Sequence, residues 1–176
     1  MMNGKTVCIV GNAPSRTRAR LEPPEHEIWA CSLTYSLLPR IDRWFEIHAV
    51  KHLRVADGQG QAYANYMRWL RDYPGTVYVT EPDPALPRAR LYPTQEVIQA
   101  FGPYLTSTIA YMLALALYEG FSRVKLFGVD LALDTEYAEQ RPCVEYLLGV
   151  AKGMGVKVVL PEDTSLLTGR RELVLA

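Results

Sequence analysis

With 176 residues, the chain is long enough for one domain with a full-sized hydrophobic core. Its 19 basic and 19 acidic side chains cancel, which excludes a global field that would draw the protein to nucleic acid or to a membrane surface. The apolar run Ile109–Tyr118 falls far short of the about 20 residues that a membrane span needs, so it predicts a buried helix. The N-terminus lacks the apolar stretch of a signal peptide. We therefore expect a cytoplasmic protein.

Three cysteines, Cys8, Cys31 and Cys143, are spread over the chain without the spacing of a metal site. An odd number of cysteines does not suit a disulfide framework either. All three are expected to be buried, reduced thiols.

Short apolar runs, most of them rich in β-branched or aromatic residues, alternate with longer helical patterns. The predicted strands are Thr6–Val10, Glu27–Cys31, Arg43–Ile47, Thr76–Val79, Arg123–Gly128 and Val156–Leu160. The predicted helices are Gln61–Asp72, Thr94–Phe101, Thr106–Glu119 and Pro142–Met154. Because the strands show little polar alternation, both faces of the sheet are expected to be covered. The pattern predicts the α/β class: a single Rossmann-like domain with a mostly parallel sheet of about six strands and helices on both faces.

A small polar loop follows the first predicted strand, with the residues Gly11, Asn12, Ala13, Pro14 and Ser15. Its backbone N–H groups could meet a phosphate, since no bulky side chain intervenes. Three arginines follow at alternate positions and make a local basic patch. The alternative is a glycine that only turns the chain after a buried strand.

Polar side chains also follow the other predicted strands, at the carboxyl edge where open parallel sheets bind ligands. Ser32 follows the second strand, and the third ends in His48, which shares a strand face with Glu46. His48 is a candidate general base oriented by that carboxylate. The alternative is a histidine that ends a strand and bonds a nearby carbonyl.

Three further charged residues are catalytic candidates. Asp130 lies at the mouth of the fifth strand, where metal binding, a ribose contact and capping of the next segment are all open. Arg141 has the planar fork that clamps phosphate or carboxylate, and Glu145 is a candidate base. The alternative for these last two is a simple ion pair at helical spacing.

Several strong enzyme motifs are absent from the sequence. Gly11 is not followed by the lysine of a P-loop, and the chain has no G-x-G-x-x-G, nucleophile elbow or H-E-x-x-H helix. These absences exclude the dehydrogenase and P-loop interpretations.

Short motifs together resemble one superfamily. The stretch Ile9–Ser15 resembles the nucleotide loop of Campylobacter-type bacterial sialyltransferases, and Leu105–Met112 and Val124–Leu131 resemble two later blocks of that family. The stretches Ile9–Ser15 and Val124–Leu131 also resemble the archaeal 6-hydroxymethylpterin pyrophosphokinase-like (MptE-like) family. The segments Tyr137–Pro142 and Leu160–Leu167 are similar to small proteins of tailed phages and prophages.

The resemblance implies a nucleotide site in which Gly11, Asn12, Pro14 and Ser15 border the phosphate or ribose, while Thr106 and Ser107 reach the nucleotide from a helix N-terminus. Ala13 and Ser32 are further candidate nucleotide-binding residues, although the sialyltransferases carry an asparagine after their second strand where this chain has Cys31 and Ser32. By analogy with the pyrophosphokinase-like group, Asp130 would hold Mg²⁺. The implied ligand is a nucleotide-linked small molecule of the CMP, UDP, GDP or ATP type. A phage origin would place the protein in the cytoplasm of the host bacterium.

The sequence predicts a transferase that uses a nucleotide-activated donor, for glycosyl or pyrophosphoryl transfer. Arg16 or Arg141 would offset phosphate charge, and His48 or Glu145 would act as base. The alternative is a non-catalytic phage accessory protein that binds a nucleotide or a host protein. The sialyltransferases carry a catalytic histidine in a lid before the final helix, whereas Ala132–Arg141 contains no histidine. A purely structural virion component and a homo-oligomer also stay open.

Overall fold

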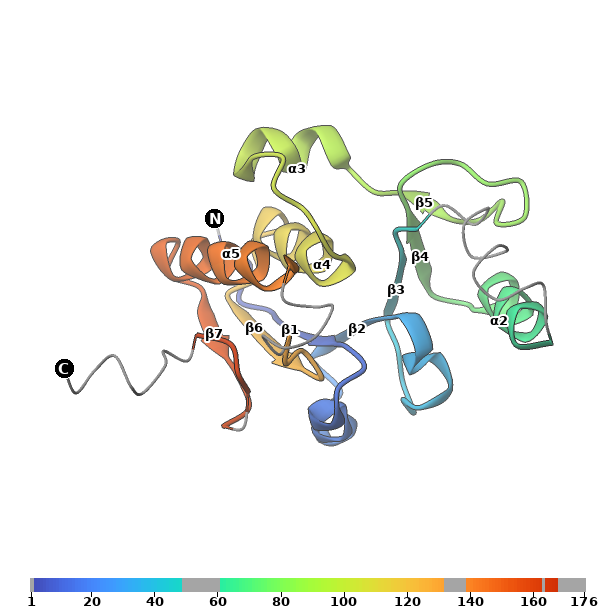
Figure 1. The fold of residues 1–176 in the computed structure, drawn as a ribbon, viewed down its shortest axis with the longest axis horizontal. Helices are drawn as coiled ribbons and strands as arrows, with labels where there is room; N and C mark the ends of the chain where they lie inside the picture. The colour runs from blue at the N-terminus through green and yellow to red at the C-terminus, as the bar shows by residue number, and fades with distance from the viewer. Residues whose placement is uncertain (1, 49–60, 132–138, 163, 168–176) are drawn as a thin grey trace.

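Seven parallel strands form the sheet at the centre of the computed structural model, which describes residues 2–48, 61–131, 139–162 and 164–167 (Figure 1). They are β1 (Thr6–Val10), β2 (Glu27–Cys31), β3 (Arg43–Glu46), β4 (Thr76–Val79), β5 (Arg90–Leu91), β6 (Arg123–Phe127) and β7 (Lys157–Val159). Their order is β5-β4-β3-β2-β1-β6-β7, and every pair is parallel. The predicted α/β class and parallel sheet are therefore confirmed.

The prediction of about six strands missed one. Strand β5 consists of Arg90 and Leu91, both exposed, so it carries no buried apolar run that a sequence pattern could reveal. The other predicted strands are present, but β3, β6 and β7 are shorter than expected.

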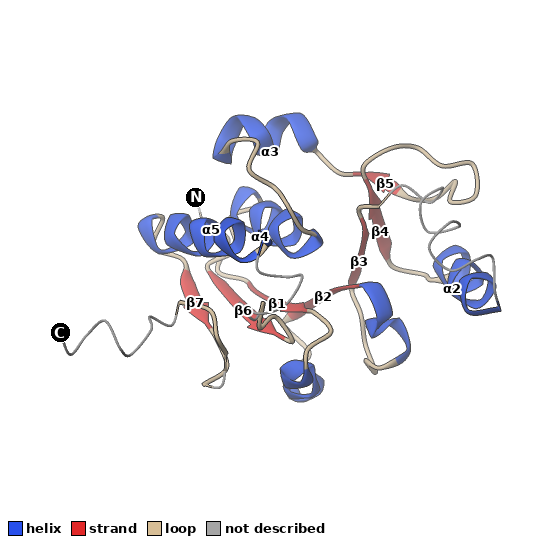
Figure 2. Ribbon diagram, in the orientation of Figure 1, coloured by secondary structure: helices blue, strands red, loops and turns tan. Residues whose placement is uncertain are grey.

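Three helices, α3 (Thr94–Phe101), α4 (Thr108–Tyr118) and α5 (Arg141–Gly153), lie on one side of the sheet (Figure 2). Helix α4 packs against β1, β3 and its two helical neighbours, and Ile109, Ala110 and Met112–Leu117 are buried. It is the buried helix that the sequence predicts. Gly120 follows it with a φ of 78°, a left-handed conformation that ends a helix at little cost for glycine.

The opposite side of the sheet carries two 3₁₀ helices, η1 (Pro14–Leu21) and η2 (Ser32–Ser36), and the helix α2 (Gln61–Asp72). Tyr66 and Trp69 of α2 pack on Trp44 of β3, with ring centroids 6.1 and 4.6 Å away. Helices therefore cover both faces, as predicted. The sequence did not predict η1 and η2, because their polar segments show no apolar periodicity.

The three cysteines are buried free thiols, as expected. No helix in the described ranges is long and apolar enough to cross a membrane. Residues 132–138, where the sequence predicts a loop before the last helix, lie outside the described residues.

The strand order reverses direction at β1. From β1 the chain proceeds outward through β2 to β5 on one side, and it returns beside β1 with β6 before continuing to β7. In doubly wound sheets the crevice at this reversal, outside the carboxyl ends of the strands, is where ligands bind. The loops that follow β1 and β6 therefore border the expected ligand crevice.

Candidate functional site

The loops after β1 and β6 touch each other through two glycines. A Cβ on Gly11 would lie 2.3 Å from the Gly128 carbonyl oxygen, and one on Gly128 would lie 2.4 Å from the Gly11 carbonyl oxygen. Gly128 also has a φ of 64°, which side-chain-bearing residues rarely adopt. Glycine is therefore required at both positions for the two strand ends to meet.

Backbone hydrogen bonds consume part of the loop that the sequence offers to a phosphate. The N–H of Gly11 donates to the Phe127 carbonyl at 2.8 Å, and that of Ala13 donates to the Gly128 carbonyl at 3.0 Å. The buried Ser15 hydroxyl accepts a 2.6 Å hydrogen bond from the N–H of Gly128. These groups fasten β1 to β6, so part of the polarity of the loop is structural.

A cavity of about 450 Å³ opens at this reversal point. Most of the residues predicted for the site line it, and they come from the ends of four strands and the start of one helix: Gly11, Asn12, Ala13, Ser32, His48, Thr106, Ser107 and Asp130. The fold thus brings together residues separated by more than a hundred positions in the chain. Pro14 and Ser15 are not among the lining residues.

Two lining residues have a strained backbone. Ser32 has a φ of 57° and Leu131 a φ of 45°, although neither is glycine. A left-handed conformation costs such a residue about 1–2 kcal/mol. Strain of this kind concentrates where a ligand site fixes the backbone, so both positions support a functional role for the cavity.

Helix α4 points its N-terminus at the cavity. Ser107 is the residue that caps it, and its hydroxyl accepts a 3.2 Å hydrogen bond from the N–H of Ala110. Thr106, Ser107, Thr108 and Ile109 all line the cavity. The positive end of the helix dipole therefore faces the space where an anionic ligand would lie.

His48 and a buried carboxylate lie on the side of the cavity formed by β3. The His48 Nδ1 atom is 3.5 Å from Oε1 of Glu46, and the Glu46 side chain is 4% exposed. The hydrogen bond that His48 donates to Glu46 raises the pKa of His48 and outweighs the burial that lowers it. The predicted orientation of His48 by a carboxylate thus matches the geometry, while its role as a base stays a prediction.

Asp130 is the carboxylate of the cavity lining within the described ranges. No group of three or more histidine, cysteine or acidic side chains in the described part of the chain is arranged to hold a metal ion. Mg²⁺ is commonly bound through one or two carboxylates together with substrate phosphates. Asp130 could supply one such ligand, so a magnesium site would depend on phosphate oxygens of the ligand.

Arg141 and Glu145 lie outside the cavity lining. The buried Arg141 donates from Nε to Glu145 Oε1 at 2.9 Å and from Nη2 to the Ser165 carbonyl. The same Glu145 oxygen accepts from the N–H of Leu167 at 2.9 Å. The two side chains form the ion pair that the sequence left open and fasten residues 164–167 to α5. Their catalytic role stays a prediction, and neither side chain lines the cavity.

Arg16, the other candidate for offsetting phosphate charge, donates from Nη1 to the carbonyl of Asn12 at 2.5 Å. It does not line the cavity. Arg16 therefore braces the loop from outside.

Sequence reasoning missed several lining residues, among them Cys31, Leu131 and Gln140. Cys31 ends β2, so the rule of strand ends could have found it. Gln140 precedes α5 and belongs to the segment Tyr137–Pro142 noted from the sequence, but it was not among the predicted site residues.

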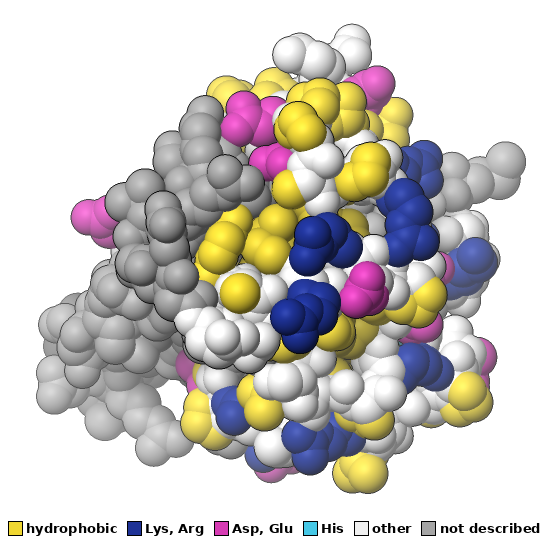
Figure 3. Space-filling view, turned by 90° about the vertical axis from the view of Figure 1, so that its right-hand side faces the viewer, with side chains coloured by type: hydrophobic (Ala, Val, Ile, Leu, Met, Phe, Trp, Pro, Cys, Tyr) yellow, Lys and Arg dark blue, Asp and Glu magenta, His cyan; other side chains and the backbone are white. Residues whose placement is uncertain are grey.

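A second cavity of about 560 Å³ lies at the opposite, amino end of β4, between that strand, α2 and the loop before β5. Figure 3 views the molecule from the side on which α2 and β5 lie in Figure 1, and lysine and arginine side chains lie on this face among hydrophobic ones. Arg88 of the cavity lining donates to the Arg71 carbonyl, and the Arg90 guanidinium lies 5.8 Å from the centre of the Tyr78 ring. These arginines already have partners within the fold, and none of the predicted site residues lies there.

No protein-family model matches the chain, and no curated protein sequence does. Solved structures of bacterial enzymes do share its fold. The sialyltransferase CstII from Campylobacter jejuni, in complex with cytidine-5'-monophosphate, is 16% identical, with a TM-score of 0.59 over 89% of this chain and 79% of that chain. An apo α-2,3-sialyltransferase from Campylobacter jejuni is 19% identical, with a TM-score of 0.61 over 93% of this chain and 78% of that one.

CstII has also been solved in complex with a trisaccharide acceptor and CMP, at 16% identity, with a TM-score of 0.59 over 89% of this chain and 80% of that chain. At these identities the likeness shows a shared fold. The resemblance to sialyltransferases noted from the sequence is thus confirmed for the fold, while the phage and MptE-like resemblances stay predictions.

Proposed function

We propose that the protein is a transferase that binds a nucleotide-activated donor in the cavity between β1, β6 and the N-terminus of α4. The observation that carries the proposal is the cavity at the reversal of strand order, lined by Gly11, Asn12 and Ser107. The fold neighbours CstII with CMP, and CstII with CMP and a trisaccharide, add support from outside the chain. A glycosyl donor is favoured over a pyrophosphoryl donor for this reason.

The cavity chemistry suits a phosphate-linked donor. The N-terminus of α4 favours negative charge, and hydroxyl and amide side chains around it can bond a ribose or a base. During glycosyl transfer, the bond between the sugar carbon and the phosphate oxygen breaks, and its electron pair stays on that oxygen. An acceptor hydroxyl forms the new bond to the sugar carbon and gives its proton to a base. Charge stabilisation at that oxygen would be the main catalytic contribution. Asp130 would contact the ribose or contribute to a Mg²⁺ site.

Calorimetry with CMP, UDP, GDP and ATP, each with and without Mg²⁺, tests the proposal. We expect one nucleotide to bind more tightly than the others, and Asn12→Ala to weaken that binding because the exposed amide faces the cavity. Thr17→Ala is a matched control, since Thr17 is an exposed residue of η1 that does not line the cavity. Absence of binding for all four nucleotides at millimolar concentration would remove the proposal.

A second candidate is a non-catalytic nucleotide-binding protein. The position of Arg141 and Glu145 outside the cavity lining favours it, because it leaves fewer groups for acid–base chemistry. The two candidates differ in turnover. Hydrolysis or transfer of the bound donor that His48→Ala or Asp130→Asn abolishes, with unchanged thermal stability, supports the transferase. Tight binding without turnover supports the alternative.

A further inference from the structure

A buried carboxylate, Glu46, is held by the hydroxyl of Tyr66, which Trp44 holds in turn. Glu46 Oε2 accepts a hydrogen bond from the hydroxyl of Tyr66 on α2, and that hydroxyl accepts one from Nε1 of Trp44 at 3.0 Å. Burial, with the charge of Glu46, raises the pKa of Tyr66, so the hydroxyl keeps its proton. The position of the carboxylate is thereby fixed, but neither neighbour neutralises its charge.

A buried negative charge is costly unless a positive partner offsets it. Within the described ranges, the ion pair of Glu46 is made with His48, and no lysine or arginine there pairs with Glu46. The arrangement therefore favours the protonated ring. His48 lines the cavity and its side chain is 64% exposed, so the ring is accessible to a ligand while Nδ1 pairs with Glu46.

The described lining of the cavity includes no lysine and no arginine, while Asp130 adds a negative charge. Among the described groups, the N-terminus of α4 and His48 are those that can offer positive charge to an anionic ligand.

We infer that Glu46 keeps His48 protonated near neutral pH, so that its imidazolium binds the anionic group of the ligand. The inference rests on the proposed function and changes one role within it. His48 acts here as a cation that holds the phosphate, in place of the base expected from the sequence.

The inference predicts a specific dependence on pH. Among the described residues, the titratable groups around His48 are Glu46 at the end of β3, Tyr66 on α2, which is bonded to Glu46, and Cys31 and Asp130 in the same cavity lining. Burial raises the pKa of Cys31 to about 12, and Tyr66 also stays neutral. Because the pKa of His48 is raised, its charge is present at low pH and is lost as the pH rises through that pKa. Anion affinity must fall in the same range.

The first test needs no nucleotide. The pKa of His48 is measured by NMR titration of the labelled imidazole ring in the wild-type protein and in Glu46→Gln, which keeps the size of the side chain and a group that can accept from Tyr66. We expect Glu46→Gln to lower the pKa. The matched control is Glu22→Gln, which removes a carboxylate 2.7 Å from another histidine, His26, and should leave the pKa of His48 unchanged. An unchanged pKa of His48 in Glu46→Gln overturns the inference.

The second test measures anion binding with ligands whose charge does not vary between pH 6 and pH 8.5: sulfate and the methyl ester of CMP. Affinity for both should fall about tenfold over this range, and Glu46→Gln should weaken binding about three- to tenfold at pH 7. Cytidine, which is uncharged, should bind equally at each pH. Ester binding that does not change with pH overturns the inference and leaves the proposed function intact. Failure of every nucleotide, the ester included, removes the proposed function, while sulfate and the first test still decide whether His48 is an anion-binding cation.

Discussion

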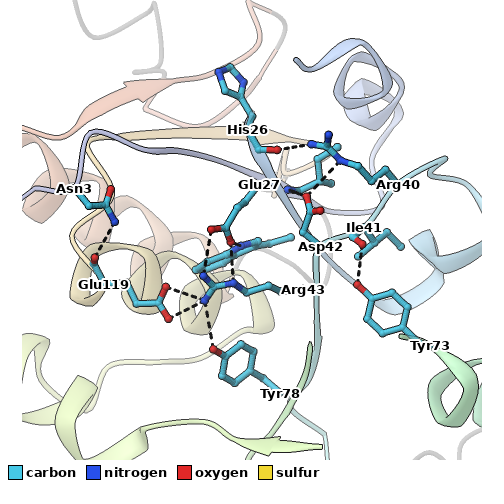
Figure 4. A network of polar contacts seen from close by, with 12 residues as sticks. Asn3, His26, Glu27, Arg40, Ile41, Asp42, Arg43, Tyr73, Tyr78 and Glu119 are labelled. Carbon is cyan, nitrogen blue, oxygen red and sulfur yellow. Dashed lines mark hydrogen bonds and ion pairs between the residues drawn. The ribbon is translucent and has the colours of Figure 1, made fainter. Parts of the chain in front are cut away.

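At the amino ends of the strands, Arg43 joins two acidic side chains into a closed network, whereas at the carboxyl ends the polar groups surround a cavity. Arg43 donates to Glu119 at 2.7 Å and to Glu27 at 2.8 Å, and its guanidinium lies 4.6 Å from the centre of the Trp29 ring (Figure 4). Burial alone would lower the pKa of Arg43, but the hydrogen bonds and charge of Glu119 and Glu27 raise it. The polar groups of the Arg43 network therefore satisfy one another within the fold.

The carboxyl end is arranged differently. Two backbone loops meet through Gly11 and Gly128, two residues hold left-handed conformations, and His48 and Asp130 line an open space. Groups that already satisfy one another add stability but have little capacity for a ligand. Polar side chains at a sheet edge therefore indicate function only where they face a cavity. Substitutions at the two ends should therefore affect the free energy of unfolding and the ligand affinity separately.

The largest effect is expected from Gly128→Ala. The new Cβ would meet the Gly11 carbonyl oxygen at 2.4 Å, and the left-handed backbone adds strain, so we expect a loss of about 3–5 kcal/mol in the free energy of unfolding. Urea denaturation measures it. The control is Gly149→Ala in α5, where nothing lies within 4 Å of the new Cβ and a gain of about 0.5–1 kcal/mol is expected. Equal stability of both variants would mean that the two loops do not meet as described.

Arg43→Met should destabilise the amino end by about 2–4 kcal/mol, since two carboxylates are left facing each other without their cation. Methionine keeps an apolar stem over Trp29, so the change isolates the charge. Nucleotide affinity, measured by calorimetry at a temperature where the variant is folded, should stay within twofold of the wild type. A loss of affinity without a loss of stability would show that the amino end takes part in binding.

Much of the sheet could be predicted because buried strands must be apolar on both faces. The apolar run Thr6–Val10 illustrates this, with all five residues buried. Strand β5 could not be predicted, since its two exposed residues gain their strand conformation only by pairing with Tyr78 and Val79. The same limit applies to η1, whose arginines follow no helical apolar pattern.

The site was predictable where the rule of strand ends applied, as for Ser32, His48 and Asp130. It was less predictable where a side chain had two chemically sensible partners. Arg141 could have bound a phosphate or Glu145, and only the folded chain brings Ser165 and Leu167 close enough to favour the internal pair. The ion pair of Arg43 with Glu119 spans 76 positions, so no local pattern could have revealed it.

The substitution Glu145→Gln tests whether Glu145 has a structural or a catalytic role. Loss of the carboxylate weakens its bonds to Arg141 and to the N–H of Leu167, and we expect a cost of about 1 kcal/mol. Thermal denaturation measures the cost, and initial rates with a donor that turns over measure the chemistry. Rates within twofold of the wild type are expected for a structural residue. A rate loss of a hundredfold or more would establish Glu145 as the general base, because positioned acid–base groups contribute at that scale.

The smallest effect is expected from Ser32→Gly, and here stability and binding should move in opposite directions. Ser32 is exposed and has a φ of 57°, so glycine relieves strain in the folded chain but adds freedom to the unfolded one. We expect a net gain of about 0.5–1 kcal/mol in the free energy of unfolding, together with a nucleotide affinity lowered about threefold, because a ligand-facing hydroxyl is lost. Ser36→Gly, in the last position of η2 and outside the cavity lining, is the control for removing a hydroxyl from the same segment. If Ser32→Gly raises stability and leaves affinity unchanged, the left-handed backbone at the end of β2 serves the turn into η2 and not the ligand.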